Sequence, residues 1–330
     1  MRYFVTGATG FIGGRVAHQL LEAGHEVVAL VRNPRKAQHL VEMGIAIAPG
    51  DITDQESLRL PMQHVDGVFH IAAWFKVGVR DRRSAEGINA GGTRNVLELM
   101  REFGIKKGVY TSTLGVFSDT KGELMDETYR YEGPHLSEYD RTKWLAHYEV
   151  AEPMMKAGLP LVIVQPGLVY GLGDSGPLGQ LLKQYLLGKL PMLPRKTTFC
   201  WAHVDDVVRG HILAMEKGRP GESYIIAGPP YTLEEAFAIA ERITGIRPPL
   251  LRVRPAMLKF MSKIMRVLGA VVPVPEMYSA ETLRVAAGVT YLASNAKAKR
   301  ELGYAVRPLE EGLRETLTHM MAELGMSPPE

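Results

Sequence analysis

The 330-residue sequence predicts an α/β fold in which a doubly wound parallel sheet is followed by a smaller, mostly helical C-terminal lobe. Three observations predict this fold: strand-like and helix-like patterns alternate over the first 170 residues, a glycine-rich turn follows the first strand, and the rhythm breaks after Gly171. Alternating strands and helices form parallel sheets with right-handed crossovers. We therefore expect one domain over residues 1–170 and a lobe over 171–330, with a return to the sheet around 201–226.

Six short apolar segments predict the strands, and four segments between them have helical periodicity. The run Val27–Val31 is continuously apolar, which is typical of a strand buried on both faces of a parallel sheet. The predicted strands are Tyr3–Thr6, Glu26–Val31, Ala46–Pro49, Gly67–His70, Lys107–Ser112 and Leu161–Gln165. The predicted helices are Arg15–Ala23, Ser57–Met62, Gly92–Phe103 and Tyr139–Lys156.

The second half has shorter elements, because glycine and proline cluster at 171–179, 191–194, 228–230 and 248–255. Within it, residues 257–274 combine many apolar side chains with three cations that share one face of a helix, Lys259, Lys263 and Arg266. One interpretation is a lobe helix whose apolar face packs inward. The other is the wall or lid of an apolar substrate pocket that makes peripheral contact with membrane lipid.

The composition is that of a globular protein with a formal charge of +3 and a pI of about 8.8. Such a small, scattered excess does not predict a nucleic-acid partner, which requires a clustered basic stripe, and a small anion fits better. The lone Cys200 excludes an intrachain disulfide and is interpreted as a buried structural thiol. Residues 1–7 enter a strand without an apolar leader, and no apolar run is long enough for stable membrane insertion, so we expect a cytoplasmic protein.

The segment Thr6–Gly13 contains three glycines, three residues apart, in the turn that joins the first strand to the first helix. Glycine lets such a turn bend tightly and lets backbone approach a pyrophosphate, while the helix directs free N–H groups at the phosphates. Similar turns occur without ligands, but the strand before and the helix after this one favour a Rossmann-type dinucleotide site. The predicted cofactor contacts here are Gly7, Thr9, Gly10, Phe11, Ile12 and Gly13.

The end of the second strand predicts which dinucleotide binds. An NAD-preferring site carries an acid there to bind the ribose hydroxyls, whereas this chain has Val31 followed by Arg32, Asn33 and Pro34. A guanidinium offers a planar fork to phosphate and stacks on adenine. We therefore predict NADP(H), with Arg32 as the leading 2′-phosphate contact and Arg35 or Lys36 as secondary ones. The alternative interpretation is a set of solvated charges at a helix start.

Tyr139 and Lys143 are four residues apart and so share one helical face. A hydride that reaches a carbonyl carbon requires a proton at the oxygen, and a phenol becomes a usable acid/base when a fixed cation stabilises the phenolate. The same spacing recurs at Tyr185 and Lys189, but Gly188 ends a helix there, so we reject that pair. Thr113 follows a predicted sheet strand, at the edge where parallel sheets bind ligands, and its hydroxyl can orient the substrate oxygen.

With these residues assembled, the chain resembles the extended short-chain dehydrogenase/reductase superfamily, also called the NAD-dependent epimerase/dehydratase family, over nearly its whole length. The matching segments are Thr6–Gly13, Gly50–Ile52, His70–Ala73, Asn89–Thr93, Thr111–Thr113, Tyr139 to Lys143, Pro166–Gly171 and His203–Val207. The resemblance implies that Tyr139 is the acid/base and that Lys143 binds the ribose and lowers the pKa of Tyr139. It also implies that Thr113 is the catalytic hydroxyl and that Asn89 supports the active site. It also implies further cofactor contacts at Asp51, Ile52, Ala72, Ala73, Pro166, Gly167 and Val169.

Within the superfamily the chain looks most like the dihydroflavonol-4-reductase-like branch, on the basis of Val31–Pro34 and Ala293–Tyr304. Several departures favour a plain reductase over a sugar-modifying enzyme. Leu114 and Gly115 follow the catalytic threonine, where sugar dehydratases place Asp-Glu, and Thr198–Trp201 replaces the Arg-Asp-Phe-like stretch of nucleotide-sugar epimerases. We therefore expect reversible reduction of an aldehyde or ketone, with two alternatives: a nucleotide-sugar epimerase or dehydratase that retains its cofactor, and a non-catalytic NADP-sensing protein.

The remaining predictions concern substrate, metal and assembly. His203–Asp206 is interpreted as a strand end with an Asp capping the next helix, and no metal site is predicted because no second ligand cluster at zinc spacing is present. The resemblance implies a homodimer through the helices at 92–103 and 139–156. The candidate substrate contacts, beside Thr113, are Trp74, Phe75, Phe199 and Trp201, which fit a substrate with an apolar or aromatic body or, equally, ordinary core packing.

Overall fold

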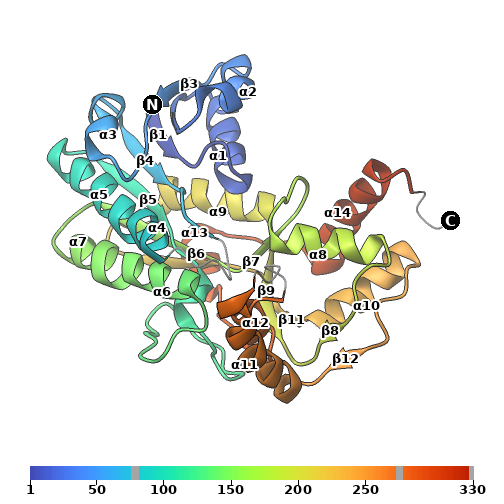
Figure 1. Cartoon of the computed structure of the whole chain (residues 1–330). Helices are drawn as coiled ribbons and strands as arrows, with labels where there is room; N and C mark the ends of the chain where they lie inside the picture. The colour runs from blue at the N-terminus through green and yellow to red at the C-terminus, as the bar shows by residue number, and fades with distance from the viewer. Residues whose placement is uncertain (76–81, 273–277, 327–330) are drawn as a thin grey trace.

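The computed structural model describes residues 1–75, 82–272 and 278–326, and its larger part is built on one parallel sheet (Figure 1). Seven strands pair in the order β10-β6-β5-β4-β1-β2-β3, and every pairing is parallel. The strands are β1 (Arg2–Thr6), β2 (Glu26–Val31), β3 (Ala46–Pro49), β4 (Gly67–His70), β5 (Lys107–Thr111), β6 (Leu161–Pro166) and β10 (Ser223–Ile226). The predicted doubly wound fold class is confirmed.

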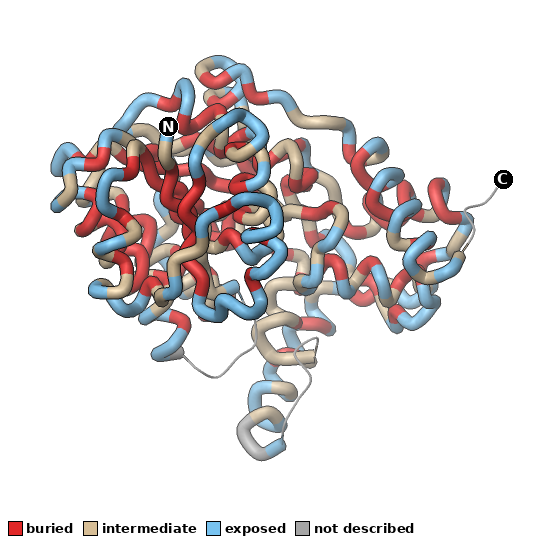
Figure 2. The backbone as a smooth tube through the Cα atoms, turned by 90° about the horizontal axis from the view of Figure 1, so that it is seen from above, coloured by how far each residue is buried: buried red, intermediate tan, exposed pale blue. Residues whose placement is uncertain are grey.

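Helices cover both faces of this sheet, because alternate strand residues point to opposite sides. Val5 and Val27 pack with α1 (Phe11–Glu22), α9 (Val204–Lys217) and α13 (Ala296–Leu302). Their strand neighbours Phe4 and Val28 pack on the other side, with α3 (Gln55–Met62), α5 (Gly92–Glu102) and the π-helical turn η4 (Leu145–Ala151). Buried residues therefore run through the interior of this part of the molecule (Figure 2).

Two helical segments beside the sheet widen into π-helical turns. The predicted helix Tyr139–Lys156 consists of α6 (Glu138–Trp144), η4 and α7 (Glu152–Lys156). In the same way, α4 (Arg82–Glu86) continues through the π-helical turn η2 (Gly87–Gly91) into α5. Such turns insert one residue into a helix and occur often at functional sites. Here they alter which side chains face the sheet edge, which periodicity alone did not predict.

The C-terminal half combines helices with two small sheets. In one sheet, β9 (Thr198–His203) pairs with β7 (Leu168–Tyr170), β11 (Pro230–Thr232) and β13 (Thr290–Tyr291). In the other, β8 (Leu193–Pro194) pairs with β12 (Arg252–Val253). The helices are α8 (Pro177–Leu186), α10 (Leu233–Thr244), α11 (Pro255–Val271), α12 (Ala280–Val285) and α14 (Leu309–Glu323).

The sheet domain also contains two short 3-10 helices. One of them, η1 (Pro34–Ala37), leads into α2 (Gln38–Glu42), and the other, η3 (Leu114–Phe117), follows β5.

The segment that was expected to return to the sheet divides between two sheets. Its last strand, β10, joins the large sheet beside β6, and α9 packs on one face of that sheet, whereas β9 belongs to the small sheet with β7. The predicted helix at 257–274 is α11, and residues 273 and 274 lie outside the described residues. None of the helices among the described residues combines the length and apolarity that crossing a bilayer requires.

Candidate active site

The turn between β1 and α1 is held tightly by its glycines. Gly7 has a positive φ of +78°, and a Cβ there would lie 2.8 Å from the backbone N of Ala72. A Cβ on Gly13 would lie 2.2 Å from the carbonyl oxygen of Gly7, so any larger residue would push α1 away from the turn. Gly7 accepts a hydrogen bond from Gly10 N at 2.9 Å. The glycines at 7 and 13 are therefore required by contacts within the chain itself.

The start of α1 presents backbone donors at this turn. Gly10 is the N-cap of α1 and contributes no side-chain cap, and the first turn of the helix carries no acidic residue. Helix N–H groups without an internal partner, together with the positive end of the helix dipole, bind phosphate. The arrangement fits the pyrophosphate of a dinucleotide, because only backbone N–H groups, and no bulky side chain, face the position where the phosphates would bind.

The strand ends around the glycine turn are joined by a buried polar chain. Thr6 Oγ1 accepts hydrogen bonds from the N–H groups of Ile71 and Ala72 at 3.1 Å each, and lies 2.8 Å from His70 Nδ1. His70 Nε2 lies 3.0 Å from Thr93 Oγ1. Burial, and then the charge of nearby Lys143, lowers the pKa of His70 to about 3, so the ring is neutral. These hydrogen bonds hold β4, and the residues that follow it as far as Ala72, against the glycine turn.

The predicted phosphate contacts lie exposed after β2. Arg32, Arg35 and Lys36 are all exposed, and no ion pair engages them among the described residues. Asn33 Oδ1 accepts the Arg35 N–H at 3.1 Å, which starts the short helix η1. Because the backbone is held in place and the cations have no ion-pair partner among the described residues, this edge of the sheet suits an anionic group.

The predicted adenine-flanking residues lie after β3. Asp51 Oδ1 accepts from Thr53 N and Thr53 Oγ1, at 2.9 and 2.8 Å, which turns the chain after the strand. Ile52 is buried against Gly92, where a Cβ would meet the Ile52 side chain at 2.6 Å. Across the sheet, Gly167 lies so close to β9 that a Cβ would come within 2.1 Å of the Cys200 carbonyl oxygen. Pro166 ends β6, and Val169 is half-buried within β7.

Tyr139 lies in the first turn of α6, beside the end of β5. Ser137 caps the helix and accepts the Asp140 N–H at 3.1 Å. Thr113 is the N-cap of η3 and accepts the Gly115 N–H at 3.1 Å. Burial raises the pKa of Tyr139 to about 12, and the nearby Thr113 side chain opposes this rise. The phenol is therefore protonated at neutral pH.

Lys143 is buried one turn further along α6 and faces β5. Its Nζ donates to the Thr111 carbonyl oxygen at 2.7 Å and to Tyr110 OH at 3.0 Å, and lies 4.7 Å from the Tyr110 ring centre. Burial lowers the pKa of Lys143 to about 7. The Tyr110 ring also stacks on His70, with ring centres 5.6 Å apart, so buried contacts continue from Thr6 to the lysine.

Asn89 ties the two π-helical segments to the chain after β4. Its Oδ1 accepts the Trp74 N–H at 2.7 Å, and its Nδ2 donates to the Trp74 carbonyl oxygen and to Thr142 Oγ1 at 2.9 Å each. Asn89 is 1% exposed, and Thr142 is its neighbour on α6, between Tyr139 and Lys143. The predicted supporting residue therefore connects the backbone beside Ala72 and Ala73 with the Tyr139 helix.

The aromatic residues predicted to bind substrate are placed differently. Phe75 is 58% exposed, while Trp74 is half-buried. Phe199 is half-buried and stacks on Tyr291, with ring centres 5.5 Å apart and planes at 7°. Trp201 is 2% exposed in the core of the C-terminal half and donates its indole N–H to the Tyr231 carbonyl oxygen. The rejected Tyr185 is buried in that core too, bonded to the Ile246 carbonyl oxygen.

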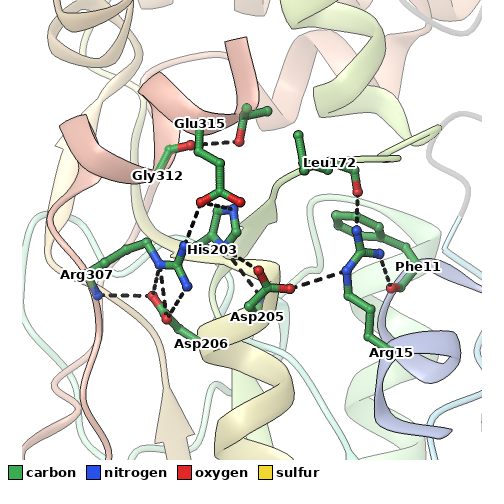
Figure 3. A network of polar contacts seen from close by, with 10 residues as sticks. Phe11, Arg15, Leu172, His203, Asp205, Asp206, Arg307, Gly312 and Glu315 are labelled. Atoms are coloured by element: carbon green, nitrogen blue, oxygen red, sulfur yellow. Dashed lines mark hydrogen bonds and ion pairs between the residues drawn. The ribbon is translucent and has the colours of Figure 1, made fainter. Parts of the chain in front are cut away.

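A charged network joins the sheet domain to the C-terminal half (Figure 3). Arg15 of α1 donates to the Leu172 carbonyl oxygen at 2.5 Å and pairs with Asp205 at 3.3 Å. Arg307 pairs with Asp206 at 3.0 Å and with Glu315 at 2.9 Å. The predicted Asp cap is wrong: the cap of α9 is His203, whose Nδ1 accepts the Asp205 N–H at 3.4 Å, while both aspartates lie within the first turn.

His203, Asp205 and Glu315 bring possible metal ligands within 4.8 Å of one another. Local spacing did not reveal this group, because Glu315 comes from α14, far along the chain. Arginines already neutralise both acids, Arg15 for Asp205 and Arg307 for Glu315. We therefore interpret the group as an ion-pair joint between α1, α9 and α14.

The sequence analysis did not predict the buried polar residues that support the active site. Thr6, His70 and Thr93 form one buried hydrogen-bonded chain, and Tyr110 stacks on His70, although these residues come from β1, β4, α5 and β5. Ser112 and His147 form a second contact of this kind, with Oγ 2.7 Å from Nδ1. Polar residues inside apolar strand patterns were the available signal, since buried polar groups need partners.

The chain matches the model of the NAD dependent epimerase/dehydratase family over residues 3–227. It belongs to this family. It is 34% identical to the Synechocystis protein named "Putative dihydroflavonol 4-reductase", over 75% of this chain and 74% of that protein. It is 28% identical to sterol demethylase protein B of Methylococcus capsulatus, over 78% of this chain and 79% of that protein.

Solved structures support the same assignment. The crystal structure of gox2253 is 31% identical, with a TM-score of 0.85 over 98% of this chain and 99% of that one. UDP-glucose 4-epimerase from Thermotoga maritima, solved with UDP-glucose, is 24% identical, with a TM-score of 0.78 over 98% of this chain and 100% of that one, and so shows the shared fold. The chain is an NAD(P)-dependent oxidoreductase of the extended short-chain dehydrogenase/reductase superfamily, and it binds a nicotinamide dinucleotide.

Proposed function

We propose that this enzyme is an NADP(H)-dependent reductase of an aldehyde or ketone, dihydroflavonol-4-reductase-like in its chemistry, and that it also oxidises the corresponding alcohol. The observation that carries this proposal is the pair of hydroxyls at the end of β5. The Tyr139 side chain lies there close enough to Thr113 for the threonine to lower its pKa against the effect of burial, one helical turn from the buried Lys143. Two hydroxyls at the carboxyl edge of a parallel sheet suit the binding of one carbonyl oxygen.

The raised pKa of Tyr139 makes its phenol a proton donor, and not a base, at neutral pH. At about 12, this pKa keeps the phenol protonated at neutral pH, so its O–H is ready to donate to a substrate oxygen. Bound NADPH supplies the hydride that reaches the carbonyl carbon. Thr113 orients the substrate oxygen by hydrogen bonding, and the protonated form of Lys143 supplies positive charge near Tyr139 as the proton leaves. Asn89 holds the Tyr139 helix against the chain after β4.

The preference for NADP(H) over NAD(H) rests on the unpaired cations after β2. Arg32 follows the last residue of the strand, where a carboxylate would favour an unmodified ribose. Because no described acid engages it, Arg32 offers its guanidinium fork to the 2′-phosphate without breaking an ion pair. Arg35 and Lys36 supply additional positive charge at the same edge.

We propose that the substrate has an apolar or aromatic body. Trp74 is held by Asn89 beside the Tyr139 helix, and Phe199 stacks on Tyr291, whose hydroxyl donates to Asp140 Oδ2 at 3.2 Å. Trp74, Phe75 and Phe199 then line the substrate, and Trp201 packs behind Phe199. The name of the relative from Methylococcus capsulatus, a sterol demethylase protein, supports an apolar substrate.

Calorimetric titration with NADPH and NADH, followed by a panel of apolar ketones, tests the proposed function. We expect NADPH to bind about tenfold more tightly or better, because a bidentate phosphate contact is worth at least about 1.4 kcal/mol. We also expect net NADPH oxidation with at least one apolar ketone. Equal affinity for the two dinucleotides would contradict the cofactor preference, and a purified enzyme that turns over no carbonyl would contradict the reductase assignment.

A second candidate is a nucleotide-sugar epimerase or dehydratase that retains its cofactor, which the description of the matching family favours. Such an enzyme would purify with NAD bound and would convert a nucleotide sugar without net NADPH oxidation. The absence of an acid after β2 argues against it, because Arg32 stands in that place.

We further propose a cytoplasmic homodimer that pairs through α5 and the α6–α7 segment. The free, buried thiol of Cys200 is compatible with a reducing compartment. A hollow of about 600 Å³ lies between α4, η2, α5 and α6, where Arg83, Gly87, Arg94 and Arg141 line it. Measurement of the mass in solution tests the dimer, and a monomer at all concentrations would exclude it.

A further inference from the structure

Helix α11 has an apolar face that the rest of the described chain does not cover. Its inner face packs on α12 and β12 through Leu258, Met261 and Met265, and Ser262 donates to the Ala280 carbonyl oxygen at 2.8 Å. A helix that needed only to close the fold would be polar elsewhere. Instead, five large apolar residues recur at i, i+3, i+7, i+10 and i+11 on another face: Met257, Phe260, Ile264, Val267 and Leu268.

These five side chains are open to solvent to a degree that is unusual for their type. Phe260 is 60% exposed and Val267 is 66% exposed, and the other three lie between 42% and 55%. Just before the helix, Leu250 and Leu251 are 92% and 60% exposed. A group of exposed apolar side chains of this size on consecutive turns of one helix marks an interaction site.

A third face of the same helix is basic. Lys259, Lys263 and Arg266 recur at i, i+4 and i+7, between the inner face and the apolar face, and all three are exposed. No ion pair engages them among the described residues, and the segment 250–272 contains five cations and no acidic residue. The uncovered surface therefore combines apolar side chains with an unopposed positive charge.

The helix lies at an edge of the molecule and next to the candidate active site. In Figure 1, α11 and α12 form the lowest part of the molecule, away from α1 and α3. Arg284 of α12 donates to the Leu136 carbonyl oxygen at 3.0 Å, just before the Tyr139 helix. Gly288 lies against Pro255 at the start of α11. The apolar surface is therefore attached to the elements that support Tyr139.

We propose that α11 and the preceding Leu250 and Leu251 form a docking surface for a bilayer that contains anionic phospholipid. The helix lies in the plane of the interface, with Phe260, Ile264 and Val267 among the acyl chains and the basic face toward lipid phosphates. An amphipathic helix with large apolar residues on one side and cations beside them suits this position. The contact is peripheral, since no described helix is able to span a membrane.

The charge distribution favours lipid over the other occupants of such a face. A second copy of this chain would bring the same three cations, Lys259, Lys263 and Arg266, against themselves, and like charges across an interface weaken it. A nucleic acid would pair with the cations but would leave five large apolar side chains in water. An anionic bilayer satisfies both faces at once.

Co-sedimentation of the full chain with phospholipid vesicles tests this surface, independently of any catalytic activity. We expect binding to vesicles of phosphatidylcholine mixed with phosphatidylglycerol, weaker binding to phosphatidylcholine alone, and loss of binding at high salt because surface charges are screened. Replacing Lys259, Lys263 and Arg266 together by Gln should weaken the partition coefficient about tenfold or more. The double variant Phe260→Ser, Val267→Ser should lose a similar factor on the same vesicles.

Matched variants elsewhere on the surface make the test specific. Arg101, Lys106 and Lys299 are also exposed, so their combined replacement by Gln removes the same charge from other elements and should change binding less than about twofold. Leu60→Ser, at a residue 79% exposed on α3, is the apolar control. No binding by the parent chain, equal losses in the controls, or an oligomer that only the α11 variants dissociate would each overturn the proposal.

Discussion

The sheet edge beneath the cofactor turn and the surface of α11 organise their residues in opposite ways. At the sheet edge, polar side chains are buried and have partners: Thr6, His70 and Thr93 are joined by hydrogen bonds, His70 stacks on Tyr110, and Tyr110 accepts a hydrogen bond from Lys143. On α11, large apolar side chains are exposed and unpartnered among the described residues. Each region reverses the usual placement of its residue types, and such reversals mark function.

This difference indicates that the sheet edge serves catalysis and that the surface of α11 serves binding to a partner. A buried polar chain is costly to disturb, because one missing partner leaves another group unsatisfied, so it holds reacting groups in fixed positions. An exposed apolar face contributes little to holding the fold, so it is free to vary with the substrate or surface that the enzyme meets. Changes at the sheet edge should therefore abolish turnover, whereas changes on α11 should alter association and leave turnover intact.

Among the variants that keep the Tyr139 hydroxyl, the largest expected effect is at Lys143. Lys143→Met removes the donor to Tyr110 and Thr111 and the positive charge near Tyr139, and kcat should fall about a hundredfold or more. Steady-state NADPH oxidation measures the change. The control is Lys189→Met, at the exposed lysine four residues after Tyr185, and it should keep kcat within about twofold of the parent. Equal losses in the two variants would show that Lys143 has no special role.

The next effect concerns the packing of the glycine turn. Gly13→Ala places a Cβ 2.2 Å from the Gly7 carbonyl oxygen, so α1 must shift away from the turn. We expect the Kd for NADPH to rise about tenfold and the free energy of unfolding to fall by about 1–3 kcal/mol. Calorimetry and urea unfolding measure the two quantities. Gly87→Ala, where a Cβ meets nothing within 4 Å, is the control, and similar losses there would contradict the packing argument.

Arg32→Ala sharpens the comparison by separating cofactor choice from catalysis. Loss of the proposed 2′-phosphate contact should raise the Kd for NADPH about tenfold to thirtyfold, while the Kd for NADH changes less than about threefold. Titration of both dinucleotides into the same variant gives the ratio. Arg101→Ala removes an exposed cation of α5 and should leave both Kd values unchanged. If Arg32→Ala raised the Kd for NADPH and the Kd for NADH by the same factor, Arg32 would not bind the 2′-phosphate.

A pH dependence of stability is expected at Asp140. Burial raises the pKa of Asp140 to about 7 from its ordinary value of 3.8, so the folded state favours the neutral carboxyl. Its stabilisation is complete below about pH 4 and is lost as the pH rises through 7. Between pH 5 and 8 the parent should lose on the order of 2 kcal/mol relative to Asp140→Asn. Urea unfolding at several pH values measures this, and parallel profiles for the two proteins would contradict it.

Local sequence patterns predicted most of the fold, because the strands and helices of the sheet domain have strong periodicity and Gly7, Gly10 and Gly13 mark the turn between them. They also predicted Tyr139 and Lys143, which are close in sequence. They did not reveal the chain from Thr6 to Tyr110, or the approach of Glu315 to His203, because those partners come from elements far apart along the chain. The π-helical turn around Asn89 was missed as well, since one inserted residue leaves little trace in an apolar pattern.

The central claim is that the Tyr139 hydroxyl donates the proton in an NADPH-dependent reduction. Tyr139→Phe removes only that hydroxyl, and single-turnover NADPH oxidation beside a calorimetric Kd tests it most directly. We predict a rate about a hundredfold to a thousandfold lower, with the Kd for NADPH within about threefold of the parent and with Tyr185→Phe unchanged in rate. A Tyr139→Phe enzyme that oxidises NADPH at the parent's rate would contradict the claim.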